Sequence, residues 1–325
     1  MFLPIGDAPN PKGVPLATYA LIAANVLAFL MLNGPLGSRQ ADVNDPAFRP
    51  YVEVMTRELQ GRADVREIVA QTSAYDLFSF EHGYRPAAPQ ITDLLTCMFL
   101  HGSFMHLFGN MLFLWIYGDN VERRLGPLRY LFWYLVTGMA ATLTHALVFS
   151  SSDVPLVGAS GAISGVLGFY FLWFPKNTVR MLAFIPPLLM RVIEIPARFV
   201  LGMYLFVDNL LPFFLSGGGG VAHGAHIGGF VAGAVVAWFM DRRGIAGRPA
   251  GIEPPSDPLA GPDAMSASWL RQGGHTDAAL SVLRRTVRDG RTGSGQAEVY
   301  ARTGERAMQK RQVFRPTRAD AEDGT

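Results

Sequence analysis

The sequence predicts an all-α membrane protein with six transmembrane helices and a short cytoplasmic tail that is partly helical. Half of the 325 residues are hydrophobic and only 17% are charged, which is too apolar for an ordinary soluble domain. The apolar residues are also clustered, in several runs that approach the roughly 17 to 25 residues needed to cross a bilayer. Lysine and arginine lie mainly in the segments between these runs.

Charge and cysteine content exclude other classes of protein. The net charge of +2 is close to balance and argues against a nucleic-acid partner. Cys97 is the single cysteine, so an intramolecular disulfide is impossible, and we expect a small buried side chain there. Residues 1–14 lack a basic stretch followed by an apolar core and a cleavage site, so no cleavable signal peptide is expected.

Residues 1–14 are predicted to be a polar cytoplasmic N-terminus, and the membrane domain is predicted over 15–243. The first span is Leu16–Leu32, in which Asn25 is expected to make an interhelical hydrogen bond. Residues 33–90 form a long polar outer loop with amphipathic helices on the membrane or over the outer face of the protein. Their apolar faces would carry Val52, Met55 and Leu59, and Val65, Ile68 and Val69.

The second span is preceded by a short apolar stretch, Ile91–Leu100. We expect either a helix that enters and leaves on one side or a helix broken at Gly102. The second span itself is predicted over Met105–Tyr117, and residues 118–127, with a glycine at each side and a final proline, are expected to end it.

The later spans are predicted over Leu128–Phe149, Ser160–Phe174, Ala197–Leu215 and Val221–Met240. The fourth is short, as if its start lay below the membrane surface. Between the fourth and fifth, Lys176–Arg191 contains two consecutive prolines and is interpreted as an interfacial connector. Gly217–Gly220 form a loop before the sixth span. Residues 244–325 are expected to be a soluble tail, with a linker at 247–263, a helix over 266–289 and a disordered end.

Basic residues in the short segments predict the orientation. They follow spans two, four and six: Arg123, Arg124, Arg129, Lys176, Arg180, Arg191, Arg242, Arg243 and Arg248. The segments 150–157 and 216–220 contain none. The positive-inside rule then places both termini in the cytoplasm, and Ser160 and the start of span six on the outer side of the cell membrane.

Ser160 is a candidate nucleophile. It lies among small residues where a loop becomes a membrane helix, beside unpaired backbone N–H groups and the positive end of the helix dipole. Both features stabilise an oxyanion. Serine and glycine also occur at helix starts for packing alone, so this interpretation requires a base elsewhere in the chain.

His226 is the best candidate base. Gly229 and Gly233 follow it at a spacing that lets two membrane helices approach closely, and Gly161 and Gly165 give the Ser160 helix a matching surface. A serine and a base on different helices must come within about 3 Å, which bulky side chains would prevent. The alternative is that these glycines serve packing only and His226 bonds a neighbour.

Two more polar side chains share one face at the start of span two. His106 and Asn110 are four residues apart and could form an oxyanion hole with the Ser160 N–H, or instead a buried network that fixes helix contacts. A metal site built on His101, His223 and His226 is a rival use of the histidines. It lacks both an HExxH motif and a neighbouring carboxylate, so neither a metal nor a cofactor is expected.

These stretches together resemble the rhomboid intramembrane serine proteases in their six-span bacterial form. The matching residues are HGSFMHLFGN at 101–110, GASG at 158–161 and GAHIGG at 224–229. Their order and their placement on spans two, four and six also match. The resemblance covers about residues 14–243 and implies a rhomboid-like helix bundle. It also implies a location in the cell membrane, which in a bacterium would be the inner membrane.

The resemblance implies a role for each matched residue. Ser160 would be the nucleophile and His226 its base, with His106 and Asn110 in the oxyanion hole. Supporting positions are His101, Gly158, Gly161 and Gly229. The chain departs from the family at Ser164, where members often carry an aromatic ring against the catalytic histidine. The outer loop 33–90 is also longer than in the smallest members.

The implied activity is a serine endopeptidase that cuts substrates in or near their transmembrane segments. Its partners would then be transmembrane protein substrates and the lipid bilayer. The alternative is a catalytically silent rhomboid-like protein that only binds membrane helices. A small transporter is a third interpretation. The sequence shows no inverted repeat, which argues against it.

Overall fold

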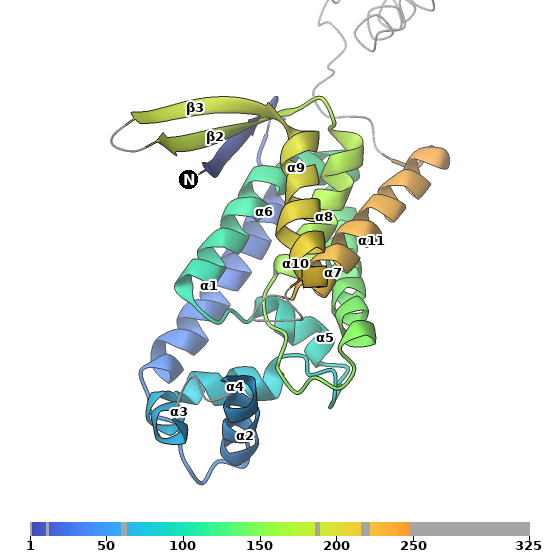
Figure 1. Ribbon diagram of the computed structural model, residues 1–325. Coiled ribbons are helices and arrows are strands. Elements are labelled where there is room, and N and C mark those ends of the chain that lie inside the picture. The colour runs from blue at the N-terminus through green and yellow to red at the C-terminus, as the bar shows by residue number, and fades with distance from the viewer. Residues whose placement is uncertain (1, 11–12, 60–63, 186–188, 216–221, 247–325) are drawn as a thin grey trace, which may run out of the picture. The chain divides into compact units, whose positions relative to one another are not determined.

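The computed structural model describes residues 2–10, 13–59, 64–185, 189–215 and 222–246, which form a mostly helical unit (Figure 1). The glycine loop predicted at 217–220 and the linker and helix predicted in the tail lie outside the described residues. The principal helices are α1 (Leu16–Gly37), α6 (Phe104–Leu125), α7 (Pro127–Val148), α8 (Ser160–Trp173), α9 (Ala197–Leu205) and α11 (His223–Arg242). After α9 the helix continues through a π-helical turn, η2 (Phe206–Leu210), into α10 (Leu211–Leu215).

Four of these helical segments are long and apolar enough to cross a membrane: α1, α7, the run from α9 through α10, and α11. A fifth arises if α6 is joined to the short helices before it, α5 (Asp93–Thr96) and η1 (Cys97–Phe99), from which it is bent by 95°. The break therefore falls at the glycine-containing segment where the sequence predicted it. Helix α8 is apolar, but its 14 residues are fewer than a full span requires.

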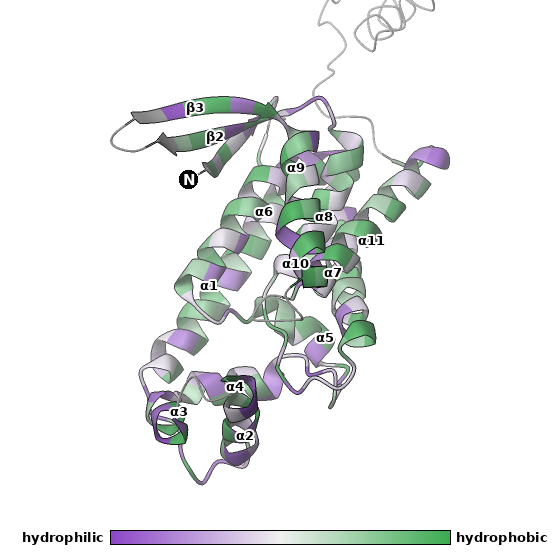
Figure 2. Ribbon diagram, viewed as in Figure 1, coloured by the Kyte–Doolittle hydropathy of each residue, from purple (hydrophilic) through white to green (hydrophobic). Residues whose placement is uncertain are grey.

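Large apolar side chains on the outside of these helices show that this is a membrane protein. Met31 on α1, Leu128 on α7 and Phe214 on α10 are each more than 70% exposed. In Figure 2 the long helices are mostly in the colours of apolar residues, whereas the short helices between α1 and α5 contain more polar residues. Transfer of these apolar side chains from water into lipid lowers the free energy, so the helices are expected to lie in a bilayer.

Helix α6 extends beyond its predicted end, to Leu125. The prediction was wrong because Gly118 does not terminate the helix. A Cβ at Gly118 would lie 2.7 Å from the Tyr130 hydroxyl and 3.0 Å from Thr18, so the glycine lets α1 and α7 approach. The last turns carry Glu122, whose carboxylate accepts hydrogen bonds from the backbone N–H groups of Ala17 and Thr18 at the start of α1.

A three-stranded antiparallel sheet is the main departure from the all-helical prediction. Its strands are β1 (Phe2–Ala8), β2 (Thr178–Ile185) and β3 (Leu189–Pro196), in that order across the sheet. The predicted polar N-terminus and interfacial connector thus pair with each other. The alternation along β2 carries the signal: Val179, Met181 and Ala183 are buried and Arg180 is exposed.

A buried carboxyl group joins this sheet to the helices. Asp7 on β1 accepts hydrogen bonds from the Tyr170 hydroxyl on α8 and from the Asn120 amide on α6, the latter at 2.8 Å. Burial raises the pKa of the Asp7 carboxyl to about 7, and the nearby Asp119 adds to the rise, against the hydrogen bond from Tyr170.

The segment predicted as the outer loop contains three short helices, α2 (Phe48–Leu59), α3 (Val65–Gln71) and α4 (Ala74–His82), at the opposite end of this unit from the sheet (Figure 1). Their small apolar cluster includes Phe48, Val54 and Phe80. Amphipathic helices were predicted here, but the predicted stripe of Val52, Met55 and Leu59 is only half-buried, because Phe48 and Val54 supply the inner face of α2.

Candidate active site

Ser160 is the first residue of α8, and the chain before it is shaped to present the side chain. Gly158 has φ 123°, a conformation that side chains with a Cβ rarely adopt. A Cβ at Gly158 would also lie 2.7 Å from Nε2 of His106. The backbone N–H of Gly158 donates to the carbonyl of Cys97 at 2.8 Å, which fixes the loop before α8 to η1. The N–H groups of the first helical turn have no partner within their helix.

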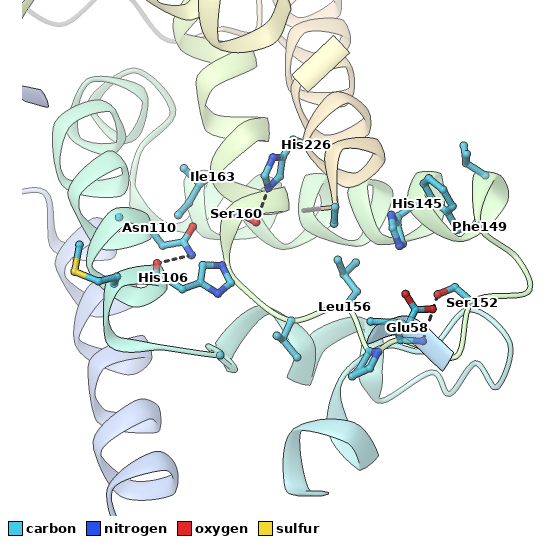
Figure 3. Close-up of a pocket in the computed structure, with 18 of the residues that line it drawn as sticks. Glu58, His106, Asn110, His145, Phe149, Ser152, Leu156, Ser160, Ile163 and His226 are labelled. Atoms are coloured by element: carbon cyan, nitrogen blue, oxygen red, sulfur yellow. Dashed lines mark hydrogen bonds between the residues drawn. The ribbon is translucent and has the colours of Figure 1, made fainter. Parts of the chain in front are cut away.

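His226 lies on the first turn of α11, and its Nε2 is 2.8 Å from Oγ of Ser160 (Figure 3). Glycines make this approach of α8 and α11 possible. A Cβ at Gly229 would lie 2.1 Å from the carbonyl oxygen of Gly161, and one at Gly233 would lie 1.9 Å from that of Gly165. No side chain fits at either position, so the two backbones are in direct contact.

The other ring nitrogen of His226 also has a partner. Its Nδ1 lies 2.7 Å from Oδ1 of Asn209, a buried residue of η2. The Nδ2 atom of Asn209 donates to the carbonyl of Tyr204 at 2.8 Å. No sequence motif surrounds Asn209, so the sequence did not connect it with the histidine.

Ser164 is the position at which the family resemblance implied an aromatic ring, and here an aromatic side chain from α9, Tyr204, contacts Ser164 and lies near His226. The hydroxyl groups of Tyr204 and Ser164 are 2.7 Å apart, and the Tyr204 ring lies 6.3 Å from that of His226, tilted by 32°. Ser164 also donates to the carbonyl of Ser160 at 2.8 Å, so the Tyr204 hydroxyl must donate to Ser164.

His106 and Asn110 lie on α6, on the side of Ser160 away from His226 (Figure 3). Oγ of Ser103 accepts from the His106 N–H at 3.2 Å and caps the helix. The Asn110 amide donates to the carbonyl of His106 at 3.1 Å. One of its two N–H groups is therefore used within α6, and the second is free for another acceptor.

His101 lies behind His106, fully buried, with their ring centroids 5.1 Å apart. The hydroxyl of Tyr75 on α4 donates to its carbonyl at 3.0 Å. This contact connects the outer-loop helices to the segment that precedes α6. Among the described residues, neither ring nitrogen of His101 has a hydrogen-bond partner.

A cavity of about 970 Å³ brings most of these side chains together. Ser160, His226, His106, Asn110 and Tyr204 line it at one end, and it extends to Ser152, Pro155 and Glu58 of the outer loops. His145 of α7 also lines it. Within the ranges that the structure describes, no three His, Cys, Asp or Glu side chains are grouped to hold a metal ion.

Part of the chain matches a known family. Residues 88–243 match the rhomboid domain family, and this range contains every polar side chain around Ser160. The chain is 31% identical over 147 residues to RHOMBOID-like protein 5 of Arabidopsis thaliana, covering 45% of the chain and 43% of that protein. It is 33% identical over 147 residues to RHOMBOID-like protein 2 of the same plant, covering 45% and 41%.

RHOMBOID-like protein 4 of Arabidopsis thaliana is 29% identical over 186 residues, which cover 57% of the chain and 39% of that protein. The chain thus spans about two fifths of the length of these curated relatives. The match falls on the helices that carry the candidate site, and this part of the chain, residues 88–243, belongs to the rhomboid family.

Proposed function

We propose that the protein is an intramembrane serine endopeptidase that hydrolyses peptide bonds in or near the transmembrane segments of other membrane proteins. The observation that carries this proposal is the 2.8 Å contact between Oγ of Ser160 and Nε2 of His226 at the wall of a cavity. A nucleophile and a base within hydrogen-bond distance are the minimum for acyl transfer. Membership of the rhomboid family supports the same reaction class.

The reaction follows from the positions of the groups. His226 accepts the Ser160 hydroxyl proton at Nε2 while Oγ attacks the substrate carbonyl carbon, and an acyl-enzyme forms when the imidazolium returns that proton to the leaving amine. Water then attacks the ester by the same route. The negative charge on the carbonyl oxygen is stabilised by the Ser160 N–H, the His106 ring and the free N–H of Asn110.

The substrate must present an unfolded peptide bond at the depth of Ser160. Small and helix-breaking residues near the cut would favour this, because they lower the stability of a substrate helix. The cavity continues toward Ser152 and Glu58, so the residues flanking the cut on the aqueous side would lie among polar side chains there.

The proposal includes six spans, with α8 as a short one. Helix α8 is enclosed by α6, α7, α9 and α11, and 10 of its 14 residues are buried, so it needs little contact with lipid. The C-terminal ends of α6 and α11, whose last turns contain Arg123 and Arg242, lie at the end of the unit that carries the sheet (Figure 1), and Arg180 belongs to β2 of the sheet itself. That end would face the cytoplasm by the positive-inside rule, and the site would open outward.

Fluorophosphonate labelling of the purified protein, together with cleavage of a reporter membrane substrate in liposomes, tests the function. Wild-type protein should be labelled and active, and S160A and H226A should lose both properties. S152A is the matched control, because Ser152 lines the same cavity but has no histidine partner among the described residues. Labelling that persists in S160A would remove Ser160 from this role. Substrate binding by a wild-type protein that is neither labelled nor active would indicate a silent helix-binding protein.

A further inference from the structure

The helix run that contains α9 and η2 supplies two contacts to the candidate dyad, and Asn209 makes the more informative one. It is 1% exposed, so its amide must find its partners inside the protein. Its Nδ2 lies 2.8 Å from a backbone carbonyl, that of Tyr204, which can only accept. The amide nitrogen therefore faces Tyr204, and the oxygen Oδ1 faces His226 at 2.7 Å.

This orientation determines the tautomer of the histidine. An amide oxygen only accepts hydrogen bonds, so Nδ1 of His226 must carry the proton and donate it. In the neutral ring Nε2 is then the unprotonated nitrogen, and it is the atom 2.8 Å from Oγ of Ser160. The Tyr204 carbonyl thus fixes the orientation of the Asn209 amide, and the amide oxygen fixes the tautomer of the His226 imidazole. The lone pair on Nε2 is then directed at the Ser160 hydroxyl.

Asn209 lies in the π-helical turn η2. In η2 the backbone bonds run from i to i+5, which widens the helix by one residue. The Asn209 side chain bonds the carbonyl five residues earlier, that of Tyr204 in the last turn of α9. Tyr204 is itself tied to α8 through Ser164, so the whole run is fixed against both helices that carry the dyad. Widened turns of this kind occur often at functional sites.

We infer that Asn209 is a positioning residue for the reaction proposed above, the third member of a hydrogen-bonded chain that runs from Ser160 through His226 to Asn209. It holds Nδ1–H toward a neutral acceptor in both the resting imidazole and the imidazolium that forms during attack. This inference rests on the proposed function. It adds a residue from the α9–η2 run, to which neither the matched motifs nor the comparisons assign a role.

Three variants test the inference in the full chain. N209A removes the acceptor and should lower kcat roughly 10- to 100-fold with little change in KM, a smaller loss than the about 10²- to 10⁴-fold effect of a general base itself. N209D keeps an acceptor toward Nδ1 but loses the donor to the Tyr204 carbonyl, so it should recover only part of the activity that N209A loses. N25A is the matched control: Asn25 is also fully buried and also donates to a carbonyl on its own helix, that of Leu21. It should retain the wild-type kcat per folded molecule.

The pH–rate profile separates positioning from a purely structural role. The titratable groups around His226 are His106 on α6, His145 on α7 and His223 on its own helix, with Asp208 beside Asn209 on η2. N209D adds a carboxylate next to Nδ1, which stabilises the imidazolium, so the acid limb of the profile should move to higher pH. N25A should leave that limb unchanged.

A second measurement does not depend on activity. Nitrogen-15 spectra of the histidine-labelled full chain, with H226Q for assignment, should show His226 protonated at Nδ1 in wild type and a mixture of tautomers in N209A. An unchanged tautomer and an unchanged kcat in N209A would overturn the inference while S160A still tests the protease function. An inactive wild type with the Nδ1–H tautomer would overturn the function and leave the positioning contact intact.

Discussion

Replacing Gly229 with alanine should separate the two halves of the candidate dyad without touching either residue. Gly229 lies one turn after His226 on α11, and it faces the residue that follows Ser160. A Cβ there would lie 2.1 Å from the carbonyl oxygen of Gly161, whereas real Cβ contacts are essentially never shorter than 3.0 Å. That oxygen belongs to the backbone of α8, so no side-chain rotation relieves the clash.

The size of the displacement follows from these distances. The two helices must move apart by about 0.9 Å at this point to reach the shortest acceptable contact. If that movement falls along the bond between Ser160 and His226, its length grows from 2.8 Å to about 3.7 Å, outside hydrogen-bond range. A misplacement of about 1 Å can cost on the order of 10² in rate. Overpacking should cost about 1 to 3 kcal/mol of stability, which leaves the bundle folded.

The assay is the rate of fluorophosphonate labelling and of reporter cleavage per folded molecule, with folding followed by thermal unfolding in detergent. G202A is the matched control, because a Cβ at Gly202 on α9 meets nothing within 4 Å. It should keep wild-type rates and stability. G229A protein that is folded and labelled as fast as wild type would refute the reasoning that direct contact between the α8 and α11 backbones sets the dyad.

Two further predictions concern stability. Because burial raises the pKa of Asp7 to about 7, the folded protein holds a proton that the unfolded chain releases above about pH 4. That stabilisation is complete below pH 4 and is lost as the pH rises through 7. Thermal unfolding should show a loss of about 1.4 kcal/mol in wild type between pH 6 and pH 8 that D7N lacks, and parallel losses in both would contradict this. Separately, E122A leaves the Ala17 and Thr18 N–H groups without their acceptor and should cost roughly 2 to 3 kcal/mol in unfolding titrations. E122Q, which keeps the shape and one acceptor oxygen, should cost less, and a loss equal to that of E122A would contradict this account.

The hydrophobic runs determined the helices almost completely. A long apolar run can only satisfy its backbone inside a bilayer as a helix, so the starts of α1, α8 and α9 fall at the predicted residues. The runs could not show where α6 ends, since its last turns are polar and their partners, Thr18 and Asp7, come from distant parts of the chain. The sheet was missed for the same reason: β1 and β2 stabilise each other only when paired, although they are more than 160 residues apart.

The sequence alone determined which residues are candidates for the chemistry. Serine, histidine and their flanking glycines carry that information locally, because close backbone contact demands glycine wherever the two helices meet. Only the tertiary structure decided what holds the histidine. Asn209 and Tyr204 belong to a helix with no motif of its own, and their importance depends on a widened turn and on the space that Ser164 leaves open. Such contacts are set by how three helices pack, a property that no stretch of sequence contains by itself.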